Sequence, residues 1–338
     1  MTTTIFNRRW GFWALGAVAA AMAGAALNVG IASAHQGIPP GQTPATAWGF
    51  ITNPIPSLFL MGAVYLYVNG LNNWPNPTHR VNAWQKACFF SGILVLFAAL
   101  QSPIEPLAEH YFSVHQVQHL MVRMVGPLLI LLGAPLTPML RGMPTWARRN
   151  IVRRLVRSPL ARWTYGKITN PVFTTVTFLA LLFVWQAPGP HDLAVHNDWV
   201  HELMHGTMLT SGFLFWWIVI DPKPHRSRLH YGLRVLYLGL IVLPNTLLGA
   251  GITFQEELIY SAYQELPRPW EGFSHLSDQR FGGLILWVPG DMMSILSAGI
   301  VMYMWYQREM EANPNPPMPQ PVVDGDVDDA VEPDQPER

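Results

Sequence analysis

Long apolar blocks, separated by short polar connections, make up most of this chain. A block of about 20 apolar residues is long enough to cross the hydrocarbon core of a membrane as a helix. Hydropathy predicts seven such spans, and proline inside several of them predicts kinks. The spans cover residues 53–71, 87–102, 111–140, 168–187, 199–220, 234–252 and 281–306. We therefore predict an all-α fold, a polytopic transmembrane helix bundle surrounded by the lipid bilayer.

The N-terminal segment has the features of a targeting signal. A pair of arginines precedes an apolar run at residues 10–31, and residues 32–34 fit an A-x-A cleavage site. The sequence thus predicts a signal peptide or an anchor helix over residues 1–34. Cleavage would make His35 the mature N-terminus, whereas the length of the apolar run also fits a retained helix.

The C-terminal segment is different again. Residues 307–338 are rich in Pro, Asp and Glu and have no apolar periodicity, which predicts a disordered, acidic tail. The membrane domain is expected between the two terminal segments, over residues 35–306. The chain shows no internal repeat and no second domain.

Composition supports a membrane protein and narrows its chemistry. Half of the residues are apolar and 12% are charged, whereas a soluble domain carries roughly twice that share of charge. The formal net charge is zero, so we expect no nucleic acid as a partner. Cys88 is the one cysteine, which excludes a CxxC metal or redox motif. Soft-metal chemistry would have to use the 12 His and 15 Met residues.

Lys and Arg are distributed unevenly among the connections. Alternate connections are basic, and the most basic one lies at residues 141–167. Residues 35–52, 102–114 and 188–200 carry no Lys or Arg. Basic connections stay on the cytoplasmic side of a membrane. We therefore predict a multi-pass protein of the bacterial cytoplasmic (inner) membrane, with a periplasmic mature N-terminus and a cytoplasmic C-terminus.

Most of the 12 histidines fall on the predicted periplasmic side. His115 and His119 open the third span, and His201 and His205 open the fifth. Residues four apart lie on one face of a helix, about 6 Å apart. Because both helices enter from the same side, the two pairs are predicted at matching depth. The histidines on this side are His35, His110, His115, His119, His191, His196, His201, His205 and His275.

The residue types suggest a metal site, and they leave copper, zinc and iron open as the ion. Imidazole suits Cu, Zn and Fe, and thioether sulfur favours Cu(I). Met204 and Met208 lie on the same helix face as the second pair, which slightly favours copper. If the site belongs to a metal carrier, which must release its ion, we expect exposed coordination. Asp278, at the start of the seventh span, could be an auxiliary ligand or could orient one. The predicted metal-binding residues are His115, His119, His201, His205 and Asp278.

Other interpretations of the histidines stay open. His201 to His205 fits H-E-x-x-H, the zinc-protease pattern in which Glu202 would be the general base, with Asp278 or Asp291 as a distant ligand. Histidines on different helices could also ligate haem, as in a membrane b-type cytochrome. In a scaffold without metal they would contact a partner protein or lipid. The second pair is unexplained by the protease interpretation, so we expect no catalytic residues.

Two charged residues fall inside predicted spans. Arg123 is one turn below His119, and Asp291 lies in the seventh span. An isolated charge in the bilayer is costly, so such residues face the bundle interior and usually pair. Arg123 could neutralise a carboxylate, repel cations from deeper passage, or form a structural ion pair.

At these residues the sequence resembles a known family, the CtaG family of assembly factors for caa-type cytochrome c oxidases. Three motifs carry the resemblance, in the same order as in the family and spread over residues 50–306. The presequence and the tail lie outside it, and Glu202 within the second pair departs from the expected pattern. The motifs are His115-Gln116-Val117-Gln118-His119-Leu120-Met121 with its continuation to Thr137, the pair His201-x-x-x-His205, and Asp278-Gln279-x-x-Gly282-Gly283-Leu284-x-x-Trp287.

The resemblance implies a role in the assembly of a haem–copper cytochrome c oxidase, as a step in respiratory chain biogenesis. It implies copper binding at the periplasmic face and delivery to the oxidase catalytic subunit, which would be the main partner. Periplasmic copper chaperones are possible further partners. On this interpretation the protein is not an enzyme.

Overall fold

The computed structural model describes residues 53–74, 81–220, 229–266, 268 and 272–312. Among these residues 86% are helical and none lies in a strand, which confirms the all-α prediction. The predicted signal or anchor segment, His35 and residues 313–338 of the predicted tail lie outside the described residues. The predicted division of the chain at residues 34 and 306 therefore stays a prediction.

Within the described residues, five helices are long and apolar enough to cross a membrane. Two bent helix pairs raise the number to seven if each pair is one span, in agreement with the seven predicted spans. The first pair, Phe112–Leu132 with α8 (Leu136–Gly142), bends by 77°, and the second, α11 (Pro159–Ile168) with α12 (Pro171–Gln186), bends by 63°. The five long helices are α3 (Ile55–Asn72), α4 (Ala83–Gln101), α14 (Asp198–Ile220), α15 (Tyr231–Thr253) and α17 (His275–Ala312).

The third predicted span is a continuous helix with two irregularities. It consists of α6 (Phe112–Leu120), the π-helical turn η1 (Met121–Val125) and α7 (Gly126–Leu132). It ends at Leu132; Ala134 then has a left-handed φ of 47°, and Pro135 is the N-cap residue of α8. The break at Pro135 agrees with the kinks predicted from proline inside the spans. A π turn inside a helix is often found at a functional site, and this one follows directly after His119.

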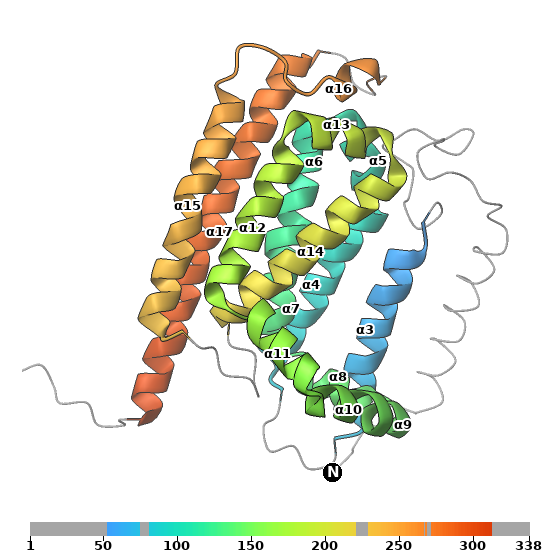
Figure 1. Ribbon diagram of the computed structural model, residues 1–338, viewed down its shortest axis with the longest axis vertical. Helices are drawn as coiled ribbons and strands as arrows, with labels where there is room; N and C mark the ends of the chain where they lie inside the picture. The colour runs from blue at the N-terminus through green and yellow to red at the C-terminus, as the bar shows by residue number, and fades with distance from the viewer. Residues whose placement is uncertain (1–52, 75–80, 221–228, 267, 269–271, 313–338) are drawn as a thin grey trace, which may run out of the picture.

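The two ends of the bundle differ in composition (Figure 1). The short helices α5 (Ile104–His110), α13 (Pro188–His196) and α16 (Ala262–Glu265) lie at one end, together with the start of α6. At the other end, the Arg-rich connection is itself helical, as α9 (Thr145–Ala147), η2 (Arg148–Val152), α10 (Arg153–Arg157) and α11. This separation agrees with the alternation of basic connections. The prediction that the first end faces the periplasm is not tested by the fold.

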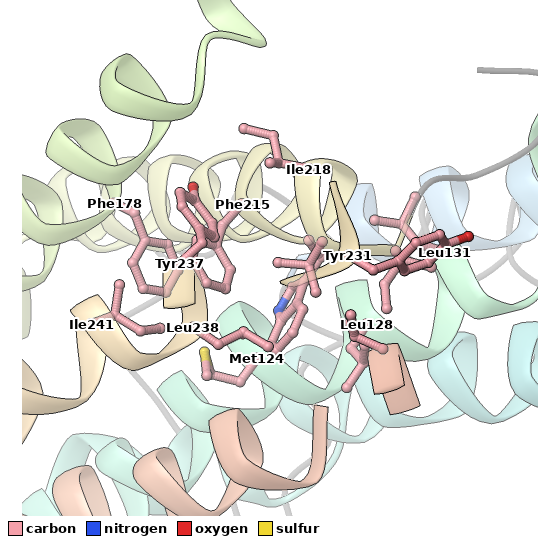
Figure 2. Close-up of a cluster of buried hydrophobic side chains, with 14 residues drawn as sticks. Met124, Leu128, Leu131, Phe178, Phe215, Ile218, Tyr231, Tyr237, Leu238 and Ile241 are labelled. Carbon is pink, nitrogen blue, oxygen red and sulfur yellow. The ribbon is translucent and has the colours of Figure 1, made fainter. Parts of the chain in front are cut away.

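An apolar core fills the lower part of the bundle and fixes the helices that carry the histidines (Figure 2). It joins side chains of α7, α12, α14, α15 and α17, among them the fully buried Phe215, Trp216 and Val219 of α14. The ring of Phe215 on α14 stacks on Phe178 of α12 and on Tyr237 of α15, at centroid distances of 4.4 and 5.1 Å. In a membrane, contacts of this kind hold helices together through van der Waals packing and not through removal of apolar surface from water.

Candidate metal centre

The first turn of α6 is held by a side chain from α17. Both carboxylate oxygens of Asp278 accept backbone N–H groups, from Phe112 at 2.9 Å and from Ser113 at 3.1 Å. These amides have no partner within the helix, and a negative charge at a helix N-terminus is favourable. Arg268 Nη2 lies 3.2 Å from the same carboxylate. Asp278 therefore fixes where α6 begins and how far its histidines project into the bundle.

Two glycines beside Asp278 allow the helices to approach. A Cβ on Gly282 would lie 2.3 Å from the ring of Phe112, and a Cβ on Gly283 would lie 2.6 Å from Thr253 Oγ1. Gln279 holds the loop that leads to α16, since it accepts the N–H of Ile259 at 2.8 Å. The D-Q-x-x-G-G motif is thus explained by packing and by hydrogen bonds that join α17 to α6 and to this loop.

The two histidine pairs meet in the bundle interior. One ligand atom each of His115, His201 and His205 lies within 4.8 Å of the others. The ring centroids of His115 are 5.3 Å from His201 and 6.1 Å from His205. All three side chains are buried, with exposed fractions of 1% for His115 and 4% for the other two. The expectation of exposed coordination is therefore wrong, because α5, α13 and α16 cover this end of the bundle.

His119 lies beside this group of three but is not part of it. Its ring centroid is 4.3 Å from that of His115 and 5.7 Å from that of His205. It points one turn deeper into the bundle, toward Arg123. The structure thus brings all four predicted rings together, as a triad of His115, His201 and His205 with His119 below it.

A chain of hydrogen bonds assigns the proton of His115. His191 Nδ1 lies 3.0 Å from the carbonyl oxygen of Trp185, so this nitrogen must donate. His191 Nε2 then accepts the hydroxyl proton of Tyr263, at 2.9 Å. The Tyr263 oxygen in turn accepts from His115 Nδ1, at 2.7 Å. A neutral imidazole carries one proton, so His115 Nε2 is left with a lone pair.

His201 has an acidic partner on its other side. Glu105 Oε1 lies 3.5 Å from His201 Nδ1, and Glu105 also contacts Gln118 Nε2. A carboxylate on one nitrogen of a histidine is the usual arrangement when the other nitrogen binds a metal. Burial, followed by the charges of Glu109 and Glu202, raises the pKa of Glu105 well above its usual range.

The residues of the cluster suit a metal ion. His115 Nε2, His205 Nε2 and both nitrogens of His119 are buried and have no hydrogen-bond partner. A buried polar atom without a partner costs about 1–3 kcal/mol, and four such atoms in one place call for a ligand. Two nitrogens on one ion, at about 2 Å each, lie at most about 4 Å apart. The triad, with its 4.8 Å spacing, needs only a small contraction to reach that geometry.

Burial also keeps the flanking groups in the protonation state that ligation requires. Desolvation lowers the pKa of His191 to about 4, so its ring is neutral at pH 7. Desolvation, with the charge of Asp278 as a second cause, raises the pKa of Tyr263 well above its usual range, so the phenol keeps its proton. Both groups can then maintain the hydrogen-bond chain to His115.

Two sequence candidates lie outside the cluster. Asp278 has donors on both oxygens, and its predicted role as a ligand or as an orienting residue of a metal site stays a prediction. Glu202 is exposed on the outer face of α14, where its Oε1 accepts from Asn53 at 2.6 Å. A general base has to reach the water on the metal, and Glu202 points away from the buried triad. His196 is half-exposed and lies 3.3 Å from Glu265.

Sequence reasoning did not single out Tyr263, His191 and Glu105 as parts of the site. His191 was one of nine histidines on its side, with no partner at helical spacing. Tyr263 belongs to the four-residue helix α16, too short for a periodic pattern. Glu105 is one of several acids in the connections on that side, and from the sequence a solvated loop charge is the simpler explanation for it.

Comparisons with known proteins point to one family. Residues 63–308 match the family model of the cytochrome c oxidase caa3 assembly factor, a range that includes all four histidines. An uncharacterised protein of Mycobacterium bovis and one of Mycobacterium tuberculosis are each 26% identical to the chain over 245 residues, which cover 70% of this chain and 35% of the relative. This chain therefore spans about a third of the length of these curated relatives. No solved structure matches the chain.

Proposed function

The chain belongs to the cytochrome c oxidase caa3 assembly factor family, and we propose that it is an integral membrane factor that carries copper to a haem–copper oxidase. The copper is cargo and binds in the buried histidine cluster. It passes to the catalytic subunit of the oxidase at the periplasmic face of the inner membrane, and periplasmic copper chaperones are its source. The protein acts by binding and transfer and is not an enzyme.

One observation carries this proposal: buried imidazole nitrogens without partners converge on one point. His115 Nε2 and His205 Nε2 are both unpartnered, and the ligand atoms of the triad lie within 4.8 Å of one another. The proton assignment through Tyr263 leaves the lone pair of His115 directed away from its hydrogen bond. Three neutral nitrogens and no carboxylate among them suit a soft or borderline ion such as Cu(I) better than Mg²⁺ or Ca²⁺.

The two alternative functions have less support. A metalloprotease needs Glu202 at the metal, whereas this residue is exposed and bonded to Asn53. A haem needs a flat space between its axial histidines, whereas the rings of His115 and His119, and those of His201 and His205, pack at centroid distances of 4.3 Å. The cavity that adjoins His119 has a volume of about 30 Å³, far too small for a porphyrin.

The test is copper binding by purified full-length protein loaded anaerobically with Cu(I). We expect the double variant His201→Ala/His205→Ala to lose tight copper binding and, in cells, to lower oxidase activity while it remains in the membrane. His196→Ala is the matched control, because His196 lies at the same end of the bundle but outside the cluster. Glu202→Gln should also leave copper binding and oxidase assembly unchanged.

Unchanged copper affinity and stoichiometry in the double variant would overturn the ligand assignment. A visible Soret band in purified wild-type protein would favour the cytochrome function instead. Proteolytic activity that is lost in Glu202→Gln, with metal retained, would favour the protease.

A further inference from the structure

His119 is the one predicted histidine ligand that the triad does not use, and its ring nitrogens have no hydrogen-bond partner. Its side chain is 2% exposed, and neither Nδ1 nor Nε2 makes a hydrogen bond. It lies nearer to the bundle interior than the triad, one helical turn below His115 on α6. A buried imidazole with two unpartnered nitrogens calls for a ligand of its own.

A small cavity opens on the inner side of His119. Its volume is about 30 Å³, and since a water molecule needs about 10–15 Å³, two waters or one ion can enter it. The cavity is lined by residues of α6, η1, α12, α14, α15 and α17, and its wall includes Met124 and Met208 besides His119. Both thioethers are buried, at 7% and 1% exposure.

Met208 is placed to act together with His119. It lies three residues after His205 on α14, so it faces the same side one turn deeper. His205 Nε2 is unpartnered, and its ring centroid is 5.7 Å from that of His119. The cavity wall therefore combines imidazole nitrogen and thioether sulfur, a donor set that favours Cu(I) over Cu(II) and Zn²⁺.

Arg123 lines the same cavity. Its guanidinium stacks on the ring of Phe178, 3.6 Å from the centroid, and donates to the Phe178 carbonyl at 2.9 Å. Asp291, on the opposite wall, is bonded to Asn245 at 3.0 Å and to Thr246. A cation that moved past His119 would meet the positive charge of Arg123, which makes deeper passage unfavourable.

We propose that His119 and Met208, together with His205, form a second and deeper Cu(I) site. His205 then belongs to both sites, and the histidine cluster holds two copper positions, one below the other. Copper moves from the triad to the lower position through His205, and the positive charge of Arg123 keeps it from moving deeper. This inference rests on copper as the cargo of the triad. It assigns a separate role to His119, which spacing alone had grouped with the other three histidines.

The test is X-ray absorption spectroscopy at the copper edge, on full-length protein loaded with two equivalents of Cu(I). We expect a sulfur scatterer in wild-type protein and in His115→Ala/His201→Ala, which keeps the lower position. Met208→Leu conserves volume and should remove the sulfur signal. Met204→Leu is the matched control, because Met204 is equally buried on α14 but does not line the cavity, and it should keep the signal.

Loss of an outer-shell partner already weakens metal binding 10–100-fold, so loss of the thioether ligand should weaken binding at the lower position at least about tenfold. A nitrogen-only copper shell in wild-type protein, or a sulfur signal that survives Met208→Leu, would overturn the second site and leave the triad standing. Absence of any copper binding would instead overturn the proposed function, and the second site with it.

Discussion

Replacement of Tyr263 by Phe removes one oxygen atom from the centre of the hydrogen-bond chain that ends at His115. The ring is buried and stays in place, because Phe fills the same apolar contacts. His115 Nδ1 and His191 Nε2, at 2.7 and 2.9 Å from the lost hydroxyl, then have no partner. His115 becomes free to carry its proton on Nε2, the nitrogen that faces the cluster.

The size of the effect on copper follows from the role of the hydroxyl. Removal of an outer-shell partner of a metal-bound histidine typically weakens metal binding 10–100-fold, or about 1.4–2.7 kcal/mol. We therefore expect the affinity for Cu(I) to fall by this factor in Tyr263→Phe, with copper stoichiometry unchanged at saturation. The folded protein should also lose stability, since two buried nitrogens without partners cost about 1–3 kcal/mol each.

The assay is an anaerobic competition titration of purified protein against a chromophoric Cu(I) chelator. Tyr260→Phe is the control, because the Tyr260 hydroxyl is equally buried nearby but donates to the Gln186 carbonyl at 2.7 Å and touches no ligand. It should lose some stability and keep its copper affinity. If Tyr263→Phe binds Cu(I) within twofold of wild type while Tyr260→Phe behaves the same, the proton assignment of His115 is wrong.

Two further predictions concern the scaffold. Gly212→Ala should destabilise the fold by at least about 1–3 kcal/mol in an unfolding titration, because its Cβ would lie 2.3 Å from the Arg123 carbonyl oxygen; Gly206→Ala on the same helix, where a Cβ meets nothing within 4 Å, should be neutral or stabilising. Asp278→Asn should lower stability by about 1.5–3 kcal/mol through the loss of charged hydrogen bonds to the start of α6, and should weaken copper binding without a change in the X-ray absorption ligand shell. An oxygen scatterer lost in Asp278→Asn would instead make it a ligand.

The sequence was informative about helices and helix faces because both depend on local periodicity. Apolar blocks predicted the spans, and four-residue spacing placed His115 with His119 and His201 with His205. The common direction of the two helices placed the pairs at one depth, where their rings indeed meet. None of these predictions depends on how one helix is rotated against another.

The remaining features depend on that rotation and on irregular segments. The separation of His119 from the triad depends on the packing of α6 against α14. Tyr263 reaches His115 across 148 positions of sequence, from a short helix held by Gln279. The carboxylate of Asp278 looked like a possible ligand from its position at a helix start, whereas its oxygens are taken by the amides of another helix. Contacts of this kind produce no periodic pattern in the sequence.

Because the triad is buried, the movement that releases copper should also lower the affinity of the site for copper. A metal bound at His115, His201 and His205 cannot leave until the covering segments move, and the shortest of these is the four-residue helix α16, whose Ala262 and Tyr263 pack in an apolar cluster with Phe112 and Ile252. Opening α16 therefore does two things at once: it exposes the metal, and it withdraws the hydroxyl that keeps the lone pair of His115 available. Affinity should fall by the same 10–100-fold factor as in Tyr263→Phe, so a partner that displaced α16 would both open the site and weaken its hold on copper.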